Sequence, residues 1–357
     1  MDFIRITKRD NLSRKKEILI TLLAIVLSIV FAGIILLIFG LNPFEIFKEI
    51  IMGSIGTGLR VKQTIVKAVP LIITSMGIIV AFKMKFWNIG AEGQITMRAL
   101  GASWVALNLS PNLPQPVMLL LMMVGAAVCG GIWAFIPAIF KAKLGTNETI
   151  FTLMMNYVAI KFVTYLQYGP WMDPAANGFP KIAMFPDNAV MPKLGGVNIG
   201  WILAILAAAF VYFFMNYTKK GYEITVVGES IETARYAGMN ISRIIVVAML
   251  ISGGLCGITG MIQASAIEKT LVYGIANGYG FTAIITAWLS KLNAGYAVAV
   301  CAVFAMLIQG GQYIQIALGV PSAVSDIVQG LILFFVLGSE FFMRYRVHIG
   351  RNSKEVA

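Results

Sequence analysis

The stretch Lys83-Met84-Lys85-Phe86-Trp87-Asn88-Ile89-Gly90-Ala91-Glu92-Gly93-Gln94 lies between two long apolar runs. It places two lysines, an aromatic pair and a polar group of Asn, Glu and Gln in a chain that is otherwise poor in charge. A carboxylate at the bilayer centre costs roughly 2.5–3.5 kcal/mol on insertion scales. An irregular backbone at that depth is tolerated only where protein or a water-filled cavity surrounds it. We therefore expect a broken or re-entrant element beside a polar pathway, with the backbone break at Gly90 and Gly93.

The composition is typical of a polytopic membrane protein. The 357 residues are 59% hydrophobic and 12% charged, with a mean hydropathy of +0.83. The net charge of +12 is divided among short loops, which argues against a nucleic-acid partner. Three cysteines lie in apolar runs without metal-ligand spacing, and the single histidine is His348, so we expect no metal site. No Gly-Lys dipeptide occurs, which excludes a Walker phosphate-binding loop. The chain is therefore not expected to be an enzyme or to bind a cofactor itself.

Hydropathy predicts an all-α integral membrane protein with about ten transmembrane helices. We expect a cytoplasmic basic arm over 1–17, a single transmembrane domain over 18–340 and a cytoplasmic basic tail over 341–357. The longest outside loop is expected at 169–198 and the longest inside loop at 217–243. The spans are expected at about 18–39, 64–82, from the end of the quoted stretch at 94 to 108, 117–140, 148–168, 199–216, 244–265, 281–290, 294–309 and 323–339. The segment 281–290 is short of the roughly 20 residues that a crossing helix needs, so it is expected to cross as a broken span after the glycine-rich lead-in.

The distribution of positive charge supports this topology. Twenty Lys and Arg residues fall in the segments expected inside and seven in those expected outside, with Lys161 within a span. This excess places both ends of the chain in the cytoplasm. Gly278 and Gly280 precede a small-residue run much as Gly90 and Gly93 do. The pairing suggests an inverted repeat of spans 2–5 and 7–10, which is a transporter design.

The inside loop 217–243 is expected to contain a helix of about two turns. Ser230 is a good N-cap, Glu232 suits the first turn, and Gly238 is a good stop. One face of that helix would carry Ile231, Ala234, Arg235 and Gly238. Two interpretations stay open: an ordinary solvated loop helix, or a docking helix for a soluble cytoplasmic partner.

Several of these segments resemble one family of transporters. Residues 86–94 are similar to the Phe-x-Asn-Ile-Gly-x-Glu-Gly-Gln signature of permeases in the ribose, branched-chain amino acid and nucleoside class of ABC importers. Residues 147–157 and the Gly-Pro-Trp loop at 169–180 resemble the nucleoside branch. Residues 228–238 resemble the cytoplasmic coupling motif, and Gly278-x-Gly280-Phe281 resembles a later element of the family. Two departures, Trp87 and the segment 287–291, bear on the substrate more than on the family.

The resemblance implies a fold like that of type II ABC importers and a function as the transmembrane permease subunit. It implies a second permease chain, most often a different one, a cytoplasmic ATP-binding subunit that holds ATP and Mg²⁺, and an extracellular or periplasmic substrate-binding lipoprotein. The implied substrates are nucleosides, purine nucleosides in particular. The residues implied to couple to the ATPase are Glu229, Thr233, Ala234, Arg235 and Gly238.

The candidate pathway residues each have a structural alternative. Glu92 either lines or gates a pathway or satisfies backbone N–H groups at a helix start, and Asn88 and Gln94 face the same choice. The other candidates are Trp87 and Phe281, which either stack on a nucleobase or belong to an interfacial belt, and Asn156 and Tyr157, which either line the pathway or bond between helices.

Three functions remain to be compared. The first is an ABC importer permease for nucleosides. The second is the same class of permease for a simple sugar or another small polar solute. The third is a stand-alone secondary transporter, against which the lack of a dense set of buried carboxylates argues.

Overall fold

The computed structural model describes residues 4–8, 13–109, 112–321 and 323–349. Helices account for most of these residues. The chain divides into two compact units, one formed by 1–60 together with 306–357 and one by 61–305. Each unit is described by itself.

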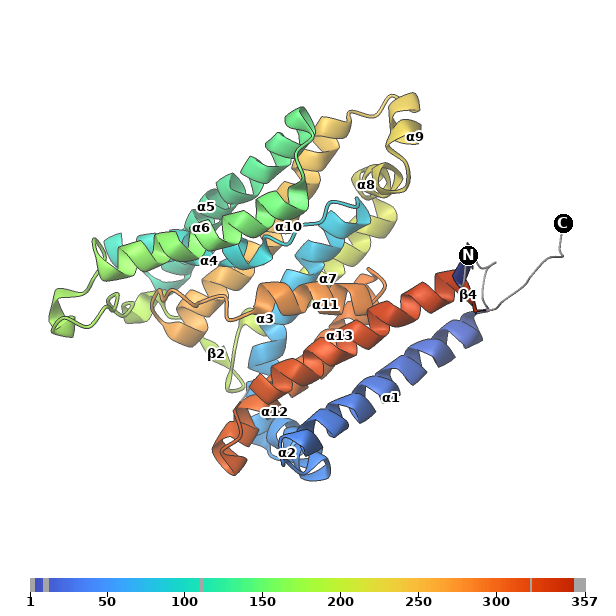
Figure 1. Ribbon diagram of the computed structural model, residues 1–357. Helices are drawn as coiled ribbons and strands as arrows, with labels where there is room; N and C mark the ends of the chain where they lie inside the picture. The colour runs from blue at the N-terminus through green and yellow to red at the C-terminus, as the bar shows by residue number, and fades with distance from the viewer. Residues whose placement is uncertain (1–3, 9–12, 110–111, 322, 350–357) are drawn as a thin grey trace. The chain divides into compact units, whose positions relative to one another are not determined.

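The first unit is built on two long helices that lie side by side. They are α1 (Arg14–Ile38) and α13 (Ala323–Arg344), and the rings of Phe31 and Phe335 meet between them at 5.7 Å (Figure 1). Helix α2 (Pro43–Ile55) and the second half of α12 (Ala294–Leu318) close the apolar core of this unit. That core consists of Leu36, Ile46, Ile50, Ile314 and Val320.

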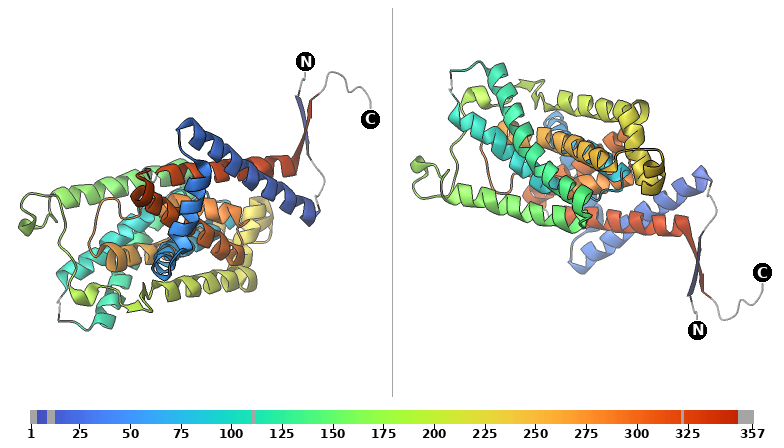
Figure 2. Two further views of the ribbon diagram at one scale, coloured as in Figure 1. Left: turned by 90° about the horizontal axis from the view of Figure 1, so that it is seen from below. Right: turned by 90° about the horizontal axis from the view of Figure 1, so that it is seen from above.

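The two ends of the described chain pair with each other. Strand β1 (Ile4–Lys8) runs antiparallel to β4 (Tyr345–Ile349), with Ile4 opposite Ile349 (Figure 2). The sequence predicted no strand here, because neither segment shows a turn or a partner nearby in the chain. The pairing brings the N-terminal arm and the C-terminal tail together.

The second unit has a core of three helices. They are α3 (Gly58–Lys83), of which all but the first residues belong to this unit, α4 (Ala91–Asn108) and α10 (Ile241–Ile262). In α3, 78% of the most apolar stretch of 18 residues is buried inside the protein. Nearly every side chain of α4 is buried as well. Around the core lie α5 (Gln115–Leu144), α6 (Glu148–Tyr168), α7 (Gly200–Tyr217) and α11 (Tyr279–Leu289). Helix α4 packs against α5, α6 and α10 (Figure 1), so its polar residues are surrounded by protein.

Local capping explains where the peripheral helices begin. Asn147 accepts hydrogen bonds from the backbone N–H groups of Thr149 and Ile150 at the start of α6. Ser230 accepts one from Thr233 at the start of α9 (Ile231–Tyr236). Both starts were expected from the sequence. Helix α8 (Lys219–Glu229), which fills the earlier part of the same inside loop, was not expected.

The loop 169–198 is bound to the helices beside it. It contains η1 (Pro174–Ala176), η2 (Asp187–Ala189) and the strand pair β2 (Lys193–Leu194) with β3 (Val197–Asn198). The backbone N–H of Met191 donates to the Ser265 carbonyl in the π-helical turn η3 (Gln263–Glu268) at 3.1 Å. The loop therefore has a defined path at the end of α10.

Among the described helices, fewer are long and apolar enough to cross a membrane than the ten that the sequence predicted. Within the described residues, six helices are long and apolar enough to cross, or seven if α1 and α2, bent by 116°, count as one span. Helix α11 has only 11 residues, and α4 contains the charged Glu92 and Arg98. Residues 41–63, between the first two expected spans, contain α2 and the start of α3. Arg98 is one of the twenty positive residues that the charge count placed in inside segments, but its side chain is 2% exposed within α4.

Candidate functional site

The candidate site is centred on the turn between α3 and α4. Helix α3 ends at Lys83 and α4 begins at Ala91, and the residues between them have no regular structure. Lys85 adopts a left-handed conformation with φ of 57°. The break therefore lies before Gly90, and Gly93 lies inside α4, where its lack of a side chain allows Asn156 of α6 to approach.

Two residues of α6 satisfy the backbone of this turn. The Asn156 carboxamide accepts from Gly93 N–H at 2.8 Å and donates to the Ile89 carbonyl at 2.8 Å. The Thr152 hydroxyl accepts from Ile89 N–H at 3.2 Å. Irregular backbone at membrane depth needs such partners, because no water is available to replace them. Asn156 is 1% exposed, and both hydrogen-bonding ends of its amide are used inside the protein.

Asn88 and Gln94 bind each other. Their amides exchange hydrogen bonds at 3.3 and 3.4 Å, and Asn88 also accepts from Gly90 N–H at 3.0 Å. A longer contact of 3.4 Å joins Asn88 to the Ser252 hydroxyl on α10. The pair closes the turn from the α10 side and is buried.

Glu92 connects the two broken elements of the chain. One carboxylate oxygen accepts from Gly278 N–H at 2.7 Å and the other from Gly280 N–H at 2.8 Å. These groups are the free donors at the start of α11, where an anion is favoured by the helix dipole. Gly278 has φ of 76°, and a side chain at Gly280 would collide with the Glu92 backbone. Glu92 thus caps a helix, but the helix is α11 rather than its own.

The aromatic candidates differ in their surroundings. Trp87 stacks on Trp288 of α11, with ring centroids 5.3 Å apart and planes at 16°, and Phe82 meets Trp87 edge-on. One face of the Trp87 ring is therefore occupied by another indole. Phe281 and Tyr157 are exposed, by 44% and 58%. Their side chains face away from the buried polar residues, although the backbone of Phe281 lies beside the Glu92 carboxylate.

The coupling segment is the next candidate, and we use this name for residues 229–238. It presents mainly exposed side chains, among them Glu229, Thr233 and Arg235, and Tyr236 is 98% exposed. Arg235 donates to Glu232 at 3.2 Å, and both side chains are exposed. Ala234, in contrast, is fully buried on the inner face of α9. The free face of α9 is thus formed by Ile231, Glu232, Arg235 and Tyr236, a face that the sequence identified only in part.

Helix α8 joins the coupling segment to the turn. Gly228, in its last turn, lies against the backbone of Lys83 and Met84, and no side chain would fit at Gly228. At the neighbouring corner, Lys141 of α5 forms an ion pair with Glu148 at the start of α6 at 2.6 Å. Sequence patterns did not indicate a role for four residues of this region, because each acts only through a contact with a distant part of the chain: Thr152, Gly228, Ser252 and Trp288.

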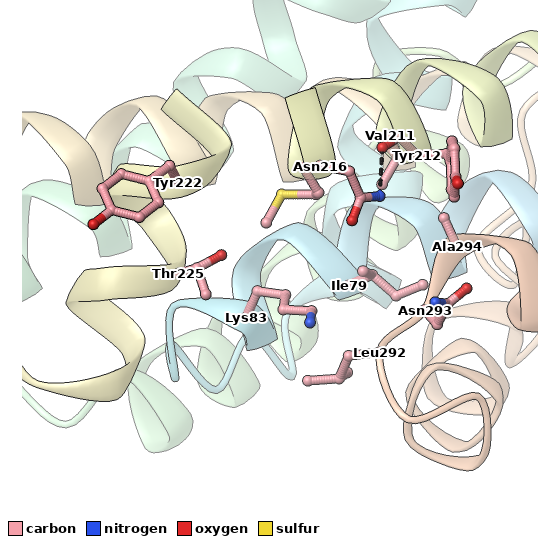
Figure 3. Close-up of a pocket in the computed structure, with 11 residues that line it drawn as sticks. Ile79, Lys83, Val211, Tyr212, Asn216, Tyr222, Thr225, Leu292, Asn293 and Ala294 are labelled. Atoms are coloured by element: carbon pink, nitrogen blue, oxygen red, sulfur yellow. Dashed lines mark hydrogen bonds between the residues drawn. The ribbon is translucent and has the colours of Figure 1, made fainter. Parts of the chain in front are cut away.

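A polar cavity opens beside these elements. It has a volume of about 290 Å³ and lies between the ends of α3 and α7, helix α8 and the turn before α12 (Figure 3). Lys83, Thr225 and Asn293 are among its lining residues. Within the described residues no group of His, Cys, Asp and Glu side chains is arranged to hold a metal ion.

Comparisons with known proteins identify relatives over most of the chain. Residues 60–337 match the family described as "Branched-chain amino acid transport system / permease component". The glucose ABC transporter permease protein TsgB13 of Haloferax volcanii is 34% identical, over 92% of this chain and 89% of that protein. The guanosine ABC transporter permease protein NupP of Bacillus subtilis is 32% identical, over 91% and 94%. The nucleoside ABC transporter permease protein NupB of Lactococcus lactis is 28% identical, over 91% and 92%. Haloferax volcanii and Bacillus subtilis each have a second, more distant relative named for the same solute as the first.

Proposed function

Because this chain belongs to the family of branched-chain amino acid transport system permease components, and is thus a multi-pass membrane permease subunit of an ABC importer, we propose that the solutes it moves are nucleosides. Purine nucleosides are the favoured members of the class. The transport step is alternating access driven by ATP hydrolysis on a separate subunit.

One observation carries the nucleoside assignment. Two relatives named for guanosine and for nucleosides align with more than nine-tenths of this chain. The segments that resemble the nucleoside branch are present as well, at residues 147–157 and 169–180. A second candidate, a simple sugar, is favoured by the glucose permease relative of similar coverage. The two substrates differ chemically in the nucleobase, which adds an aromatic face.

The proposal includes partners for the chain. A second, different permease is supported by the paired relatives of Haloferax volcanii and Bacillus subtilis. A cytoplasmic ATP-binding subunit carrying ATP and Mg²⁺ is supported by the exposed face of α9, and a substrate-binding lipoprotein completes the importer. Nucleic acid has no part in this assembly.

The proposal also covers topology. Ten crossings, with α4 and α11 as discontinuous members and spans 2–5 and 7–10 as inverted repeats, would place both ends in the cytoplasm. The pairing of β1 with β4 supports two ends on one side of the membrane, as does the Lys and Arg excess in the inside segments. The connection of α4 to α11 through Glu92 supports two related broken elements.

Reconstitution of the whole importer tests the function. The complex in proteoliposomes would contain this chain, its partner permease, its ATPase and its binding protein. We expect guanosine or adenosine to stimulate ATP hydrolysis, and glucose or ribose to leave it at the basal rate. Stimulation by the sugars alone would keep the family and replace the substrate. Uptake by this chain alone without ATP would contradict the importer mechanism.

A further inference from the structure

The cavity shown in Figure 3 has one charged side chain in its wall. Lys83 reaches into it from the end of α3, and the figure shows the lysine between Thr225 on one side and Leu292 and Asn293 on the other. In the part of the chain that the structure describes, no acidic residue lines the cavity. Among the ion pairs of the described residues, none includes Lys83. The cavity is therefore electropositive.

The carboxylate closest in sequence to the lining residues of α8 is Glu223, and its charge is already balanced by a lysine. Glu223 lies on α8 between the lining residues Tyr222 and Thr225, and it is paired with Lys220 at 2.6 Å. The Lys83 charge is thus left without an opposing charge from the cavity wall. A partly buried cation of this kind favours an anionic ligand.

Of the neutral lining residues, Asn293 has its acceptor engaged, whereas Asn216 and Thr225 each donate to a backbone carbonyl. The Asn293 side-chain oxygen accepts from the N–H groups of Gly295 and Tyr296 at the start of α12. Its NH₂ group is therefore the free end, and it is a donor. Thr225 uses its hydroxyl proton on the Gly221 carbonyl at 3.0 Å. Lys83 and Asn293 together supply donors from two elements that are far apart in the sequence.

The remaining wall indicates where the anion comes from. Ile79, Val211 and Met215 make one side apolar, and the lining residue Tyr212 is 46% exposed on α7. The outer face of α7 also exposes Phe213 and Tyr217, and such aromatic residues are typical of the membrane–water interface. The volume of about 290 Å³ is close to the lower limit of roughly 300 Å³ for small-molecule sites, which suits a headgroup better than a whole substrate.

From this geometry we propose that the cavity binds a phosphate group, supplied by the headgroup of an anionic phospholipid on the side of the membrane where α8 lies. Lys83 is the charged contact, and Asn293 is the neutral donor. Basic pockets between helices at the cytoplasmic boundary are suited to such headgroups. Because α8 forms one wall and leads into α9, the bound headgroup would join the coupling segment to the end of α3.

The test uses the intact importer in nanodiscs and measures its thermal midpoint against lipid composition. We expect phosphatidylglycerol to raise the midpoint of wild type relative to phosphatidylcholine. In Lys83→Met the phosphatidylglycerol concentration that gives half of this gain should rise about fivefold, since one lysine near the surface contributes about 1 kcal/mol. Lys219→Met is the matched control, because Lys219 is an exposed lysine of α8 that does not line the cavity. Asn293→Ala should give a smaller loss in the same direction.

The outcomes separate the source of the phosphate. An equal midpoint gain from inorganic phosphate in detergent would support the phosphate site and move its source from lipid to solution. Equal lipid responses of Lys83→Met and Lys219→Met would overturn the site. Loss of ATPase co-purification in Lys83→Met with an unchanged lipid response would also overturn it, because the lysine would then contact the partner protein. If Lys83→Met does not assemble, Lys83→Arg gives the same reading by retaining the lipid response.

Discussion

The stretch 86–94 and the coupling segment 229–238 both carry family signatures, but they use their polar residues in opposite ways. In the first stretch Asn88, Glu92 and Gln94 are buried and bonded within the chain. In the second, Arg235 and Tyr236 project into solvent. The two stretches therefore suggest two kinds of requirement: the first holds a broken backbone together, and we expect the second to meet another protein. Substitutions distinguish the two by their effect on stability.

Glu92→Ala should have the largest effect on stability. It leaves the N–H groups of Gly278 and Gly280 without their acceptor in a buried place and releases α11 from α4. We expect the unfolding free energy of the detergent-solubilised complex to fall by about 3–5 kcal/mol. Glu92→Gln, which retains one acceptor oxygen, should lie between. Glu229→Ala is the control, since Glu229 is an exposed carboxylate; equal thermal midpoints for the two alanine variants would refute the capping role.

Gly280→Ala should come next. The added methyl group meets backbone as well as carboxylate atoms of Glu92, and backbone cannot rotate away. Overpacking of this kind costs about 1–3 kcal/mol. Gly254→Ala is the matched control within the same unit, because nothing lies within 4 Å of its added methyl group. Thermal unfolding should show a lower midpoint for Gly280→Ala only, and a normal midpoint for it would mean that α11 does not pack on α4 as described.

Asn156→Ala should have a moderate effect. It removes both bonds that hold the Gly93 N–H and the Ile89 carbonyl, at a cost of about 1–3 kcal/mol. Tyr157→Phe changes the neighbouring, exposed residue of α6. It should leave the unfolding free energy within about 0.5 kcal/mol of wild type. A reduced rate of nucleoside uptake in Tyr157→Phe, with an unchanged midpoint, would assign Tyr157 to the pathway.

Arg235→Glu should have the smallest effect on stability and a large effect on coupling. Its ion pair with Glu232 is exposed, so its loss changes the unfolding free energy by about 0.2–1 kcal/mol. Placing like charges at an interface costs several kcal/mol, and we expect substrate-stimulated ATPase activity to fall by about tenfold or more. Lys219→Glu reverses an exposed charge outside the coupling segment and serves as the control. A normal ATPase response in Arg235→Glu would leave α9 as a solvated loop helix.

Most helices were predictable because their signals are local. Hydropathy located α5, α6 and α7 within a few residues, and the N-cap expected at Ser230 fixed the start of α9. Helix α8 was missed because Lys219–Glu229 has neither an apolar run nor a clear period. The β1–β4 pair was missed because its strands lie at opposite ends of the chain.

The site was predictable in its residues but not in its contacts. The combination of Glu92 with nearby glycines indicated a broken backbone, and Gly278 with Gly280 indicated a second one. That the carboxylate of the first caps the helix of the second depends on a contact across 186 positions, which no local pattern encodes. The same holds for Trp87 and Trp288, whose stacking follows from the approach of α11 to the turn.

The contact at Gly228 limits how force can pass through the molecule. The last turn of α8 rests directly on the backbone of Lys83 and Met84, with no side chain between them to change rotamer and absorb a displacement. Packed interiors compress little, so a push on α9 that moves α8 toward α3 would arrive at the turn undiminished. Gly228 therefore keeps α8 in direct backbone contact with the end of α3. Even a single added methyl group would push the two helices apart and change the position from which any movement of α8 begins.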